Sequence, residues 1–383
     1  MKIARCEVTG ANVAYQHREV SSQVERDGVT AGVIRLETDS GLVGWGEACS
    51  GADMESILAT VRAMAPFVLG RDPWRAEEMK RDAWHRGLWQ FREPTGNFAW
   101  AGLDMAMADL CGQQAGVPVH ALLGGRVRES VDYFWYLSGD DLDDLLAYAM
   151  VGLGRGYRTF YLKVGRSLED DLARVYGVRS VIGDECNLRL DANGAWSMPQ
   201  ARRILSLMQD AHLDFVEQPV RQVPAELLGD LRRMVSVPVA ANEGLWSEEQ
   251  ARERIQARVA DVYCFSPYWV GSLRGFQRLG YTVYDHGGQV CKHTHGELGI
   301  AATAAQHVML TLPAIVEGNQ QTSAHMVGDI VTEKLPIAEG PTWGVPALPG
   351  LGAIVDDNAL GAAAQAYQRD GQFLPYQMAK VGQ

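Results

Sequence analysis

The sequence has no closely spaced cysteine pair, no long apolar run and no excess of positive charge, and each absence excludes a class of protein. Its six cysteines are scattered over 383 residues without a CxxC pair, so we expect reduced thiols rather than a disulfide framework. No stretch reaches the roughly 18 consecutive apolar residues of a membrane span. We therefore expect neither a disulfide-rich scaffold nor a membrane protein.

Positive charge is the scarcer sign. Lys and Arg number 35 against 47 Asp and Glu, which gives a formal net charge of −12 and a pI of about 5.3. Such a protein repels phosphate backbones and acidic lipid surfaces, so we expect no nucleic-acid partner and no membrane partner. The first seven residues carry charges where a signal peptide has its apolar core. The expected location is the cytoplasm.

What the sequence does contain is enough apolar material for a large core. Hydrophobic residues make up 47% and charged residues 21%, which is ordinary for a globular protein. The length accommodates a barrel of about 200 to 250 residues together with a smaller domain.

Residues 1–124 have the pattern of an α+β domain. Strands are predicted at 2–9, 30–37 and 42–47, and helical periodicity runs from about 53 to 116. Between the first two strands, residues 15–27 are polar and lack a sustained apolar period. A surface loop is the favoured interpretation, and a lid over a polar substrate is the alternative.

From residue 125 to 335, short apolar strands alternate with amphipathic helices, which predicts a β/α barrel. Ser167, Ser197 and Ser247 each follow a predicted strand and begin a helix-capping pattern. Residues 336–383 lack this rhythm and are expected to pack back on the first domain. The predicted barrel strands are 131–137, 159–164, 187–191, 213–217, 237–242, 261–265, 289–293 and 314–317.

Three acidic residues each end a short apolar run: Asp191 in LRLDAN, Glu217 in DFVEQP and Glu243 in VAANEG. The same interval of 26 residues separates the first from the second and the second from the third (191 to 217, 217 to 243), about one β/α unit. The repeat places all three carboxylates on one rim of a parallel barrel. Carboxylate oxygens are the ligands that Mg²⁺ prefers, so the spacing predicts a magnesium site.

The preceding strand, in the run FYLKVG, places Tyr161 and Lys163 on one face. A lysine beside Mg²⁺ is disfavoured as a cation and can act as a general base. The alternative is a structural lysine that pairs with one of the acidic ligands.

Taken together, these motifs resemble the enolase superfamily, specifically its mandelate racemase and muconate lactonizing enzyme branch. The resemblance covers almost the whole chain and includes GLVGWGE at 41–47, GVPV at 116–119 and LLGG at 122–125. It implies an α/β fold in which an N-terminal α+β domain caps a modified TIM barrel, (β/α)₇β. It also implies that Asp191, Glu217 and Glu243 hold Mg²⁺, which binds a substrate carboxylate while a base, Lys163, removes the α-proton.

The chain departs from the family pattern at two catalytic positions. Tyr161 stands where relatives commonly carry the first lysine of a Lys-x-Lys strand, and Ser266 stands where cycloisomerases have a lysine and racemases an aspartate. The resemblance implies His293 as the seventh-strand histidine, although a two-residue shift would select His295. Glu317 matches an eighth-strand position that contacts a substrate carboxylate in some relatives, or it is a solvated acid.

These features favour a Mg²⁺-dependent dehydratase of a small polar 2,3-dihydroxy acid such as a sugar acid. Lys163 would remove the α-proton, and His293 or Tyr161 would help the β-hydroxyl leave. The first alternative is a racemase or epimerase of a hydroxy acid or amino acid derivative, with Lys163 and His293 on opposite faces of the α-carbon. The second alternative is a non-catalytic scaffold that binds carboxylates. We expect a homo-oligomer.

Overall fold

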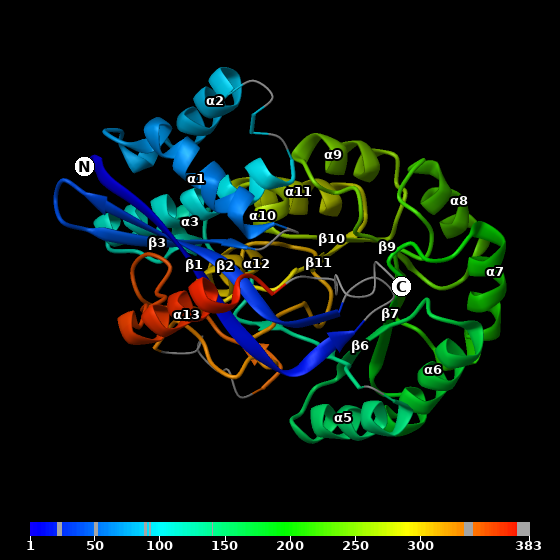
Figure 1. Cartoon of the computed structure of the whole chain (residues 1–383). Coiled ribbons are helices and arrows are strands. Elements are labelled where there is room, and N and C mark those ends of the chain that lie inside the picture. The colour runs from blue at the N-terminus through cyan, green and yellow to red at the C-terminus, as the bar shows by residue number, and fades with distance from the viewer. Residues whose placement is uncertain are drawn as a thin grey trace.

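The computed structural model describes residues 1–20, 25–49, 53–87, 90–91, 93–139, 141–332 and 340–373. Its strands form a three-stranded antiparallel sheet and a curled seven-stranded parallel sheet, with a small two-stranded pair beside them. Figure 1 shows the antiparallel sheet with its own helices on one side and the parallel sheet, ringed by helices, on the other. The predicted fold class, a modified TIM barrel with an N-terminal α+β capping domain, is confirmed.

The capping domain consists of β1 (Ile3–Val20), β2 (Glu25–Thr38) and β3 (Val43–Cys49), covered by three α-helices. Gly46 of β3 lies directly against helix α3, because a Cβ atom added there would meet the carbonyl oxygen of Gly102. A glycine is therefore required where this strand and helix touch. The helices are α1 (Met54–Val68), α2 (Ala76–Gly87) and α3 (Thr95–Ala115), with the short 3₁₀ turn η1 (Pro73–Arg75).

The prediction of a surface loop at 15–27 is wrong for the described residues. β1 continues to residue 20 and β2 begins at residue 25, and the pair Glu19 and Arg26 keeps the antiparallel register; residues 21–24 lie outside the described part. A register shift between Ala14 and Glu19 interrupts the ladder. The polar side chains here do not mark a loop, because Glu19 and Arg26 lie in paired strands and contact polar groups of the barrel.

The parallel sheet has the strand order β11-β10-β9-β8-β7-β6-β5, so consecutive strands are neighbours. The side chains of Ser167 and Ser247 cap the helices that follow them, and Ser197 forms a capping box with Gln200, as predicted. The strands are β5 (Trp135–Tyr136), β6 (Thr159–Lys163), β7 (Asn187–Asp191), β8 (Phe215–Glu217), β9 (Val239–Ala241), β10 (Val262–Phe265) and β11 (Gln289–Lys292). The helices are α5 (Leu142–Gly154), α6 (Leu168–Ile182), α7 (Met198–Leu207), α8 (Glu226–Met234), α9 (Glu248–Gln256), α10 (Pro267–Val270), α11 (Leu273–Asp285) and α12 (Gly299–Met309), with the 3₁₀ turn η2 (Gln209–Ala211).

Two predicted barrel strands differ from the structure. The segment 131–137 is split into β4 (Val131–Asp132) and β5, because β4 pairs outside the barrel with β12 (Thr342–Trp343). The segment 314–317 forms no regular strand. It is tied to Val290 by a bridge at Ile315, and the following Asn319 bridges to Tyr133 on the other side. Isolated bridges thus join the two edges of the curled sheet where an eighth strand was expected.

The C-terminal part returns to the capping domain. Helix α13 (Asp357–Asp370) lies along β1, as Figure 1 shows, and the Tyr367 ring covers Gly10. Asn12 Nδ2 donates to the Gly371 carbonyl oxygen at 2.6 Å. A short helix, α4 (Val119–Leu122), precedes the barrel.

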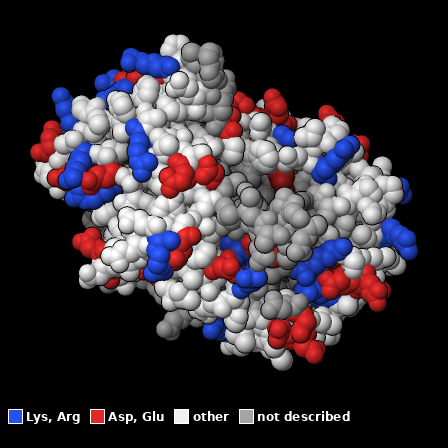
Figure 2. Space-filling view, viewed as in Figure 1, with Lys and Arg blue, Asp and Glu red and all other residues white. Residues whose placement is uncertain are grey.

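Three further expectations can be compared with the molecule. All six cysteines are unpaired, in agreement with the prediction of free thiols. Among the described helices, none combines the length and apolar character needed to span a bilayer. On the face shown in Figure 2, the basic and acidic side chains of the described residues are interspersed.

Candidate active site at the barrel mouth

The ends of three neighbouring strands bring the predicted base and two predicted metal ligands together. In the parallel register, Lys163 of β6 lies opposite Asp191 of β7, and Asp191 lies opposite Glu217 of β8. The side chains of Asp191 and Glu217 are almost fully buried, with exposures of 1% and 2%. The β/α repeat produces this arrangement, because each unit returns the end of the next strand to the same rim.

Lys163 and Tyr161 both donate to these carboxylates. Lys163 Nζ lies 2.5 Å from Asp191 Oδ2. The Tyr161 hydroxyl donates to Asp191 Oδ2 at 2.7 Å and to Glu217 Oε2 at 3.0 Å. The side chains of strand β6 therefore supply hydrogen-bond donors to the acidic cluster, and the shared face predicted for Tyr161 and Lys163 is present.

Asn193 links the base to the third acid. Its Oδ1 accepts from Lys163 Nζ at 2.9 Å, and its Nδ2 donates to Glu243 Oε1 at 3.0 Å. The backbone of Asn193 has a φ of 46°, in the left-handed region that Asn tolerates better than most residues. Sequence reasoning did not single out Asn193, although an Asn two residues after a strand-end acid is a usable signal.

The chemistry of this cluster fits a hard divalent cation. Glu217 Oε1 and Glu243 Oε2 are buried and have no hydrogen-bond partner among the described residues. Burial, followed by the charge of Asp191, raises the pKa of Glu217 well above its usual range and that of Glu243 to about 7. Unpartnered buried carboxylate oxygens are costly unless a cation or proton compensates them, and oxygen ligands suit Mg²⁺.

The three acids do not form a closed ligand set in the structure. Within the described ranges, no group of three or more His, Cys, Asp or Glu side chains already has a metal-binding arrangement. The Lys163 ammonium and the Tyr161 hydroxyl lie against the carboxylates instead. Burial lowers the pKa of Lys163, but the negative charges of Asp191, Glu19 and Glu217 outweigh it and raise that pKa overall. Lys163 is therefore a cation while the cluster is uncompensated.

The two predicted histidines follow β11 and lie beside each other, with ring centroids 4.9 Å apart. His293 Nδ1 accepts a hydrogen bond from the Trp269 indole at 3.1 Å. The His295 ring stacks on the same indole, and burial, followed by the charge of Arg26, lowers the pKa of His295 to about 3. The neighbouring Lys292 points elsewhere and forms a buried ion pair with Glu297.

The capping domain contributes to the same mouth through the end of the β1–β2 hairpin. Arg26 donates to the His295 carbonyl oxygen, and its Nε lies 3.0 Å from Glu19 Oε2. The Tyr136 hydroxyl of β5 donates to Glu19 Oε1 at 3.0 Å. These residues line a small cavity of about 20 Å³ together with His325 and neighbouring side chains. The sequence prediction missed Glu19 and Arg26 because their partners are distant in the chain.

Glu317 is placed differently from the other predicted site residues. Its side chain is exposed, and its backbone carbonyl oxygen accepts a hydrogen bond from Arg189. Among the described residues, no hydrogen bond joins its carboxylate to Lys163 or to the acidic cluster. Of the two interpretations of Glu317, the placement favours a solvated acid.

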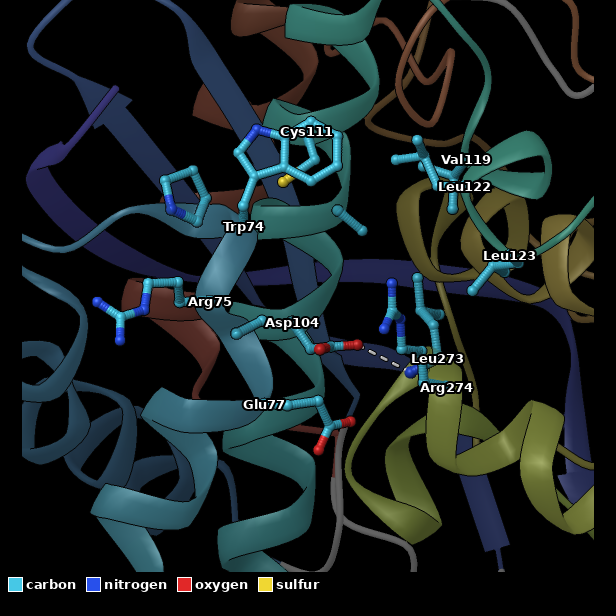
Figure 3. A pocket seen from close by; sticks show the side chains of 13 residues that line it. Trp74, Arg75, Glu77, Asp104, Cys111, Val119, Leu122, Leu123, Leu273 and Arg274 are labelled. Atoms are coloured by element: carbon cyan, nitrogen blue, oxygen red, sulfur yellow. Dashed lines mark hydrogen bonds between the residues drawn. The ribbon is translucent and has the colours of Figure 1, made fainter.

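A larger cavity of about 170 Å³ lies elsewhere, between the capping domain and α11 (Figure 3). Asp104 accepts from the Leu273 backbone N–H at 2.8 Å on its wall, and burial raises the pKa of Asp104 to about 6. The cavity shares no lining residue with the acidic cluster.

Two family models match most of the chain. Residues 13–124 match the family model of the mandelate racemase / muconate lactonizing enzyme N-terminal domain, and residues 145–359 match the enolase C-terminal domain-like model. The chain is 29% identical to L-Ala-D/L-Glu epimerase of Bacillus subtilis, over 84% of this chain and 88% of the relative. It is 28% identical to D-galactonate dehydratase of Ralstonia pickettii, over 85% of this chain and 88% of the relative.

Among solved structures, the muconate lactonizing enzyme of Pseudomonas fluorescens in complex with muconolactone superimposes with a TM-score of 0.89. Its sequence is 25% identical, and the match covers 94% of this chain and 99% of that one. The relatives thus include epimerases, a dehydratase and lactonizing enzymes.

Proposed function

The chain belongs to the mandelate racemase and muconate lactonizing enzyme branch of the enolase superfamily, and from that premise we propose that it dehydrates a polar 2,3-dihydroxy acid, such as a sugar acid. It is an enzyme whose relatives are lyases and isomerases, and members of the superfamily generally bind Mg²⁺. The finer assignment of substrate and reaction is the proposal. The observation that carries it is the contact of Lys163 with Asp191 beside the unpartnered oxygens of Glu217 and Glu243.

We assign metal binding to Asp191, Glu217 and Glu243. A Mg²⁺ ion held there would supply positive charge that stabilises the negative charge developing on the substrate carboxylate when the α-proton leaves. The unpartnered oxygens of Glu217 and Glu243 are the free ligand atoms that such an ion requires. Asn193 orients Glu243 by donating to its other oxygen.

Lys163 is the proposed general base. Its Nζ lies at the acidic cluster. The Lys163 side chain is only 13% exposed, so it is largely shielded from bulk water. As a cation it cannot accept a proton, and the uncompensated carboxylates keep it a cation. Base function in Lys163 is therefore expected only when the charge of the cluster is compensated. Tyr161 keeps Asp191 and Glu217 in place through its hydroxyl.

The polar hairpin end favours dehydration of a hydroxylated acid. Glu19, Arg26 and Tyr136 surround the small cavity at the mouth, and hydroxyl groups are natural partners for such side chains. The similarity to D-galactonate dehydratase supports the same substrate class. The alternative, a racemase or epimerase, is supported by the similarity to an L-Ala-D/L-Glu epimerase and by a histidine, His293, after β11.

A panel of sugar acids, hydroxy acids and N-substituted amino acids, incubated with protein and Mg²⁺ in D₂O, tests the proposal. Formation of a 2-keto acid from a 2,3-dihydroxy acid supports dehydration. Incorporation of α-deuterium with inversion of configuration identifies a racemase or epimerase instead. Binding of carboxylates without exchange at the α-carbon indicates a non-catalytic scaffold and overturns the proposal. Lys163→Ala in the same assay controls for exchange that does not depend on the site.

A further inference from the structure

The hydrogen bond between Trp269 and His293 determines which nitrogen of the histidine carries the proton. Trp269 belongs to α10, which follows β10, and its Nε1 lies 3.1 Å from His293 Nδ1, with the two rings inclined by 80°. An indole N–H is only a donor, so Nδ1 of the imidazole must accept. The proton of a neutral imidazole then lies on Nε2.

Trp269 is held in place from several sides. It is 4% exposed, and its backbone carbonyl oxygen accepts from Asn97 Nδ2 at 2.8 Å. The Trp246 ring lies on one side at a centroid distance of 5.8 Å, and the His295 ring stacks on it at 4.9 Å. The indole therefore cannot turn its N–H away from His293 without disrupting this packing.

The surroundings of His293 also oppose a positive charge on its ring. Burial is the largest cause of the lowered pKa of His293, and further positive or ionisable groups add to it: His295, Lys163, Lys292 and Arg26. Among the described residues, no carboxylate hydrogen-bonds to Nδ1. Ser266, at the end of β10, is fully buried and its hydroxyl has no partner there.

We propose that Trp269 is a positioning residue that fixes His293 as a neutral imidazole with its N–H on Nε2, so that His293 donates a hydrogen bond to the substrate and does not accept or transfer a proton. The inference rests on the proposed function for the identity of the reacting substrate, and on the indole contact for the state of the ring. A histidine whose substrate-facing nitrogen already holds a proton cannot accept another there.

The consequence is a reaction with a single base. The α C–H bond breaks and its proton goes to the uncharged amine of Lys163. The β C–O bond then breaks, and the hydroxyl leaves as water with the proton that the Lys163 ammonium returns. The enol product rearranges to a 2-keto acid, and Lys163 is again an amine. Racemisation needs a second acceptor on the opposite face of the α-carbon, and the fixed His293 does not provide one.

Nitrogen-15 NMR of the full-length protein labelled in its histidine rings tests the inference without substrate. His293→Asn identifies the His293 signals by their loss. The expected result is a neutral Nε2–H tautomer for His293 throughout pH 5.5 to 8. A cationic ring near pH 7, or a proton on Nδ1, overturns the inference. This measurement on the unaltered chain does not depend on whether any Trp269 variant folds.

Trp269→Phe keeps the aromatic packing and removes the N–H. In this variant His293 is expected to show mixed tautomers and to become protonated at a higher pH than in the unaltered protein. Trp246→Phe is the matched control. The Trp246 indole N–H is buried and has no partner among the residues that the structure describes, so its loss is expected to leave the His293 signals unchanged. Identical His293 tautomers in Trp269→Phe and the unaltered protein overturn the inference.

The substrate panel in D₂O separates this inference from the proposed function. If no acid exchanges its α-proton while the Nε2–H tautomer is observed, the proposed function fails and the inference on the ring stands. If α-deuterium appears in both configurations and His293→Asn abolishes exchange from one enantiomer, His293 transfers a proton and the inference fails.

Discussion

Two glutamates in strands, Glu47 in β3 and Glu217 in β8, are both almost fully buried, but their carboxyl oxygens have different hydrogen-bond partners. Burial raises the pKa of both carboxyls, that of Glu47 to about 8. Both oxygens of Glu47 accept backbone N–H groups at the start of α12, from Leu298 at 2.7 Å and from Ala301 at 2.9 Å. Glu217 accepts from Tyr161 at one oxygen, and its other oxygen has no hydrogen-bond partner in the described part of the chain.

The difference separates a structural acid from a binding acid. At the domain junction, where Glu47 of β3 and His307 of α12 lie, the Glu47 carboxyl oxygens accept backbone N–H groups at the start of a barrel helix and join the two domains. At the barrel mouth, the unpartnered oxygen costs free energy in the isolated chain and is available to a cation. Burial alone does not distinguish the two glutamates. They differ in whether each carboxyl oxygen accepts a hydrogen bond.

Glu217→Gln is expected to have the largest effect on activity and almost none on folding. The amide removes a ligand charge, so Mg²⁺-dependent α-proton exchange should be abolished, as in Asp191→Ala and Glu243→Ala. The thermal unfolding midpoint should be unchanged or higher, because the amide removes a buried negative charge beside Asp191. Calorimetric Mg²⁺ titration and deuterium exchange measure both effects. Full activity and metal affinity in all three variants would show that the assignment of the metal site is wrong.

Lys163→Ala should lower the rate of α-proton exchange by about 10²- to 10⁴-fold, the usual cost of losing a positioned general base. Mg²⁺ affinity should be retained, because the carboxylates remain. Exchange is followed by NMR in D₂O. His293→Asn is the comparison, since it should retain exchange in a dehydratase and lose it from one enantiomer in a racemase. Exchange at the unaltered rate in Lys163→Ala would transfer the base role to His293 or His295.

At the domain junction, acid should act on stability through His307. Its Nδ1 accepts from the His120 backbone N–H and its Nε2 lies 3.0 Å from the Leu351 carbonyl oxygen, so the ring is held neutral. Burial lowers the pKa of His307 from 6.5 to about 4. The stabilisation is therefore present above pH 6.5 and is lost as the pH falls towards 4, by roughly 3 kcal/mol.

Urea unfolding at several pH values measures this loss, which should be reduced in His307→Asn. His85→Asn, at an exposed position, is the control and should follow the unaltered protein. Equal acid sensitivity in His307→Asn and the unaltered protein would exclude His307 as the cause.

Glu47→Gln should have the smallest of these effects and should appear only in stability. One amide N–H would face a backbone N–H of α12, and a buried donor without an acceptor costs about 1 to 3 kcal/mol. The urea midpoint should fall, while Mg²⁺ affinity and exchange in the folded protein stay unchanged. A loss of Mg²⁺ affinity without a loss of stability would contradict the distinction between the two glutamates.

The sequence alone determined the features that depend on local chain geometry. A β/α unit has a nearly constant length, so equal intervals were enough to predict Asp191, Glu217 and Glu243 at one rim, with Asp191 one unit after Lys163. The helix caps at Ser167, Ser197 and Ser247 are equally local, because each serine bonds within its own first turn.

Only the tertiary structure decided the features that depend on partners distant in the chain. Glu19 and Arg26 lie in paired strands and not in a surface loop. Their side chains contact the Tyr136 hydroxyl and the His295 carbonyl oxygen, which both belong to the barrel. The position of His293 in the sequence does not predict whether its Nδ1 lies beside a hydrogen-bond acceptor or a donor. The packing of Trp269 against the end of β11 places a donor there. Whether a histidine can move a proton depends on the donors and acceptors that contact it, and these are known only from the tertiary structure.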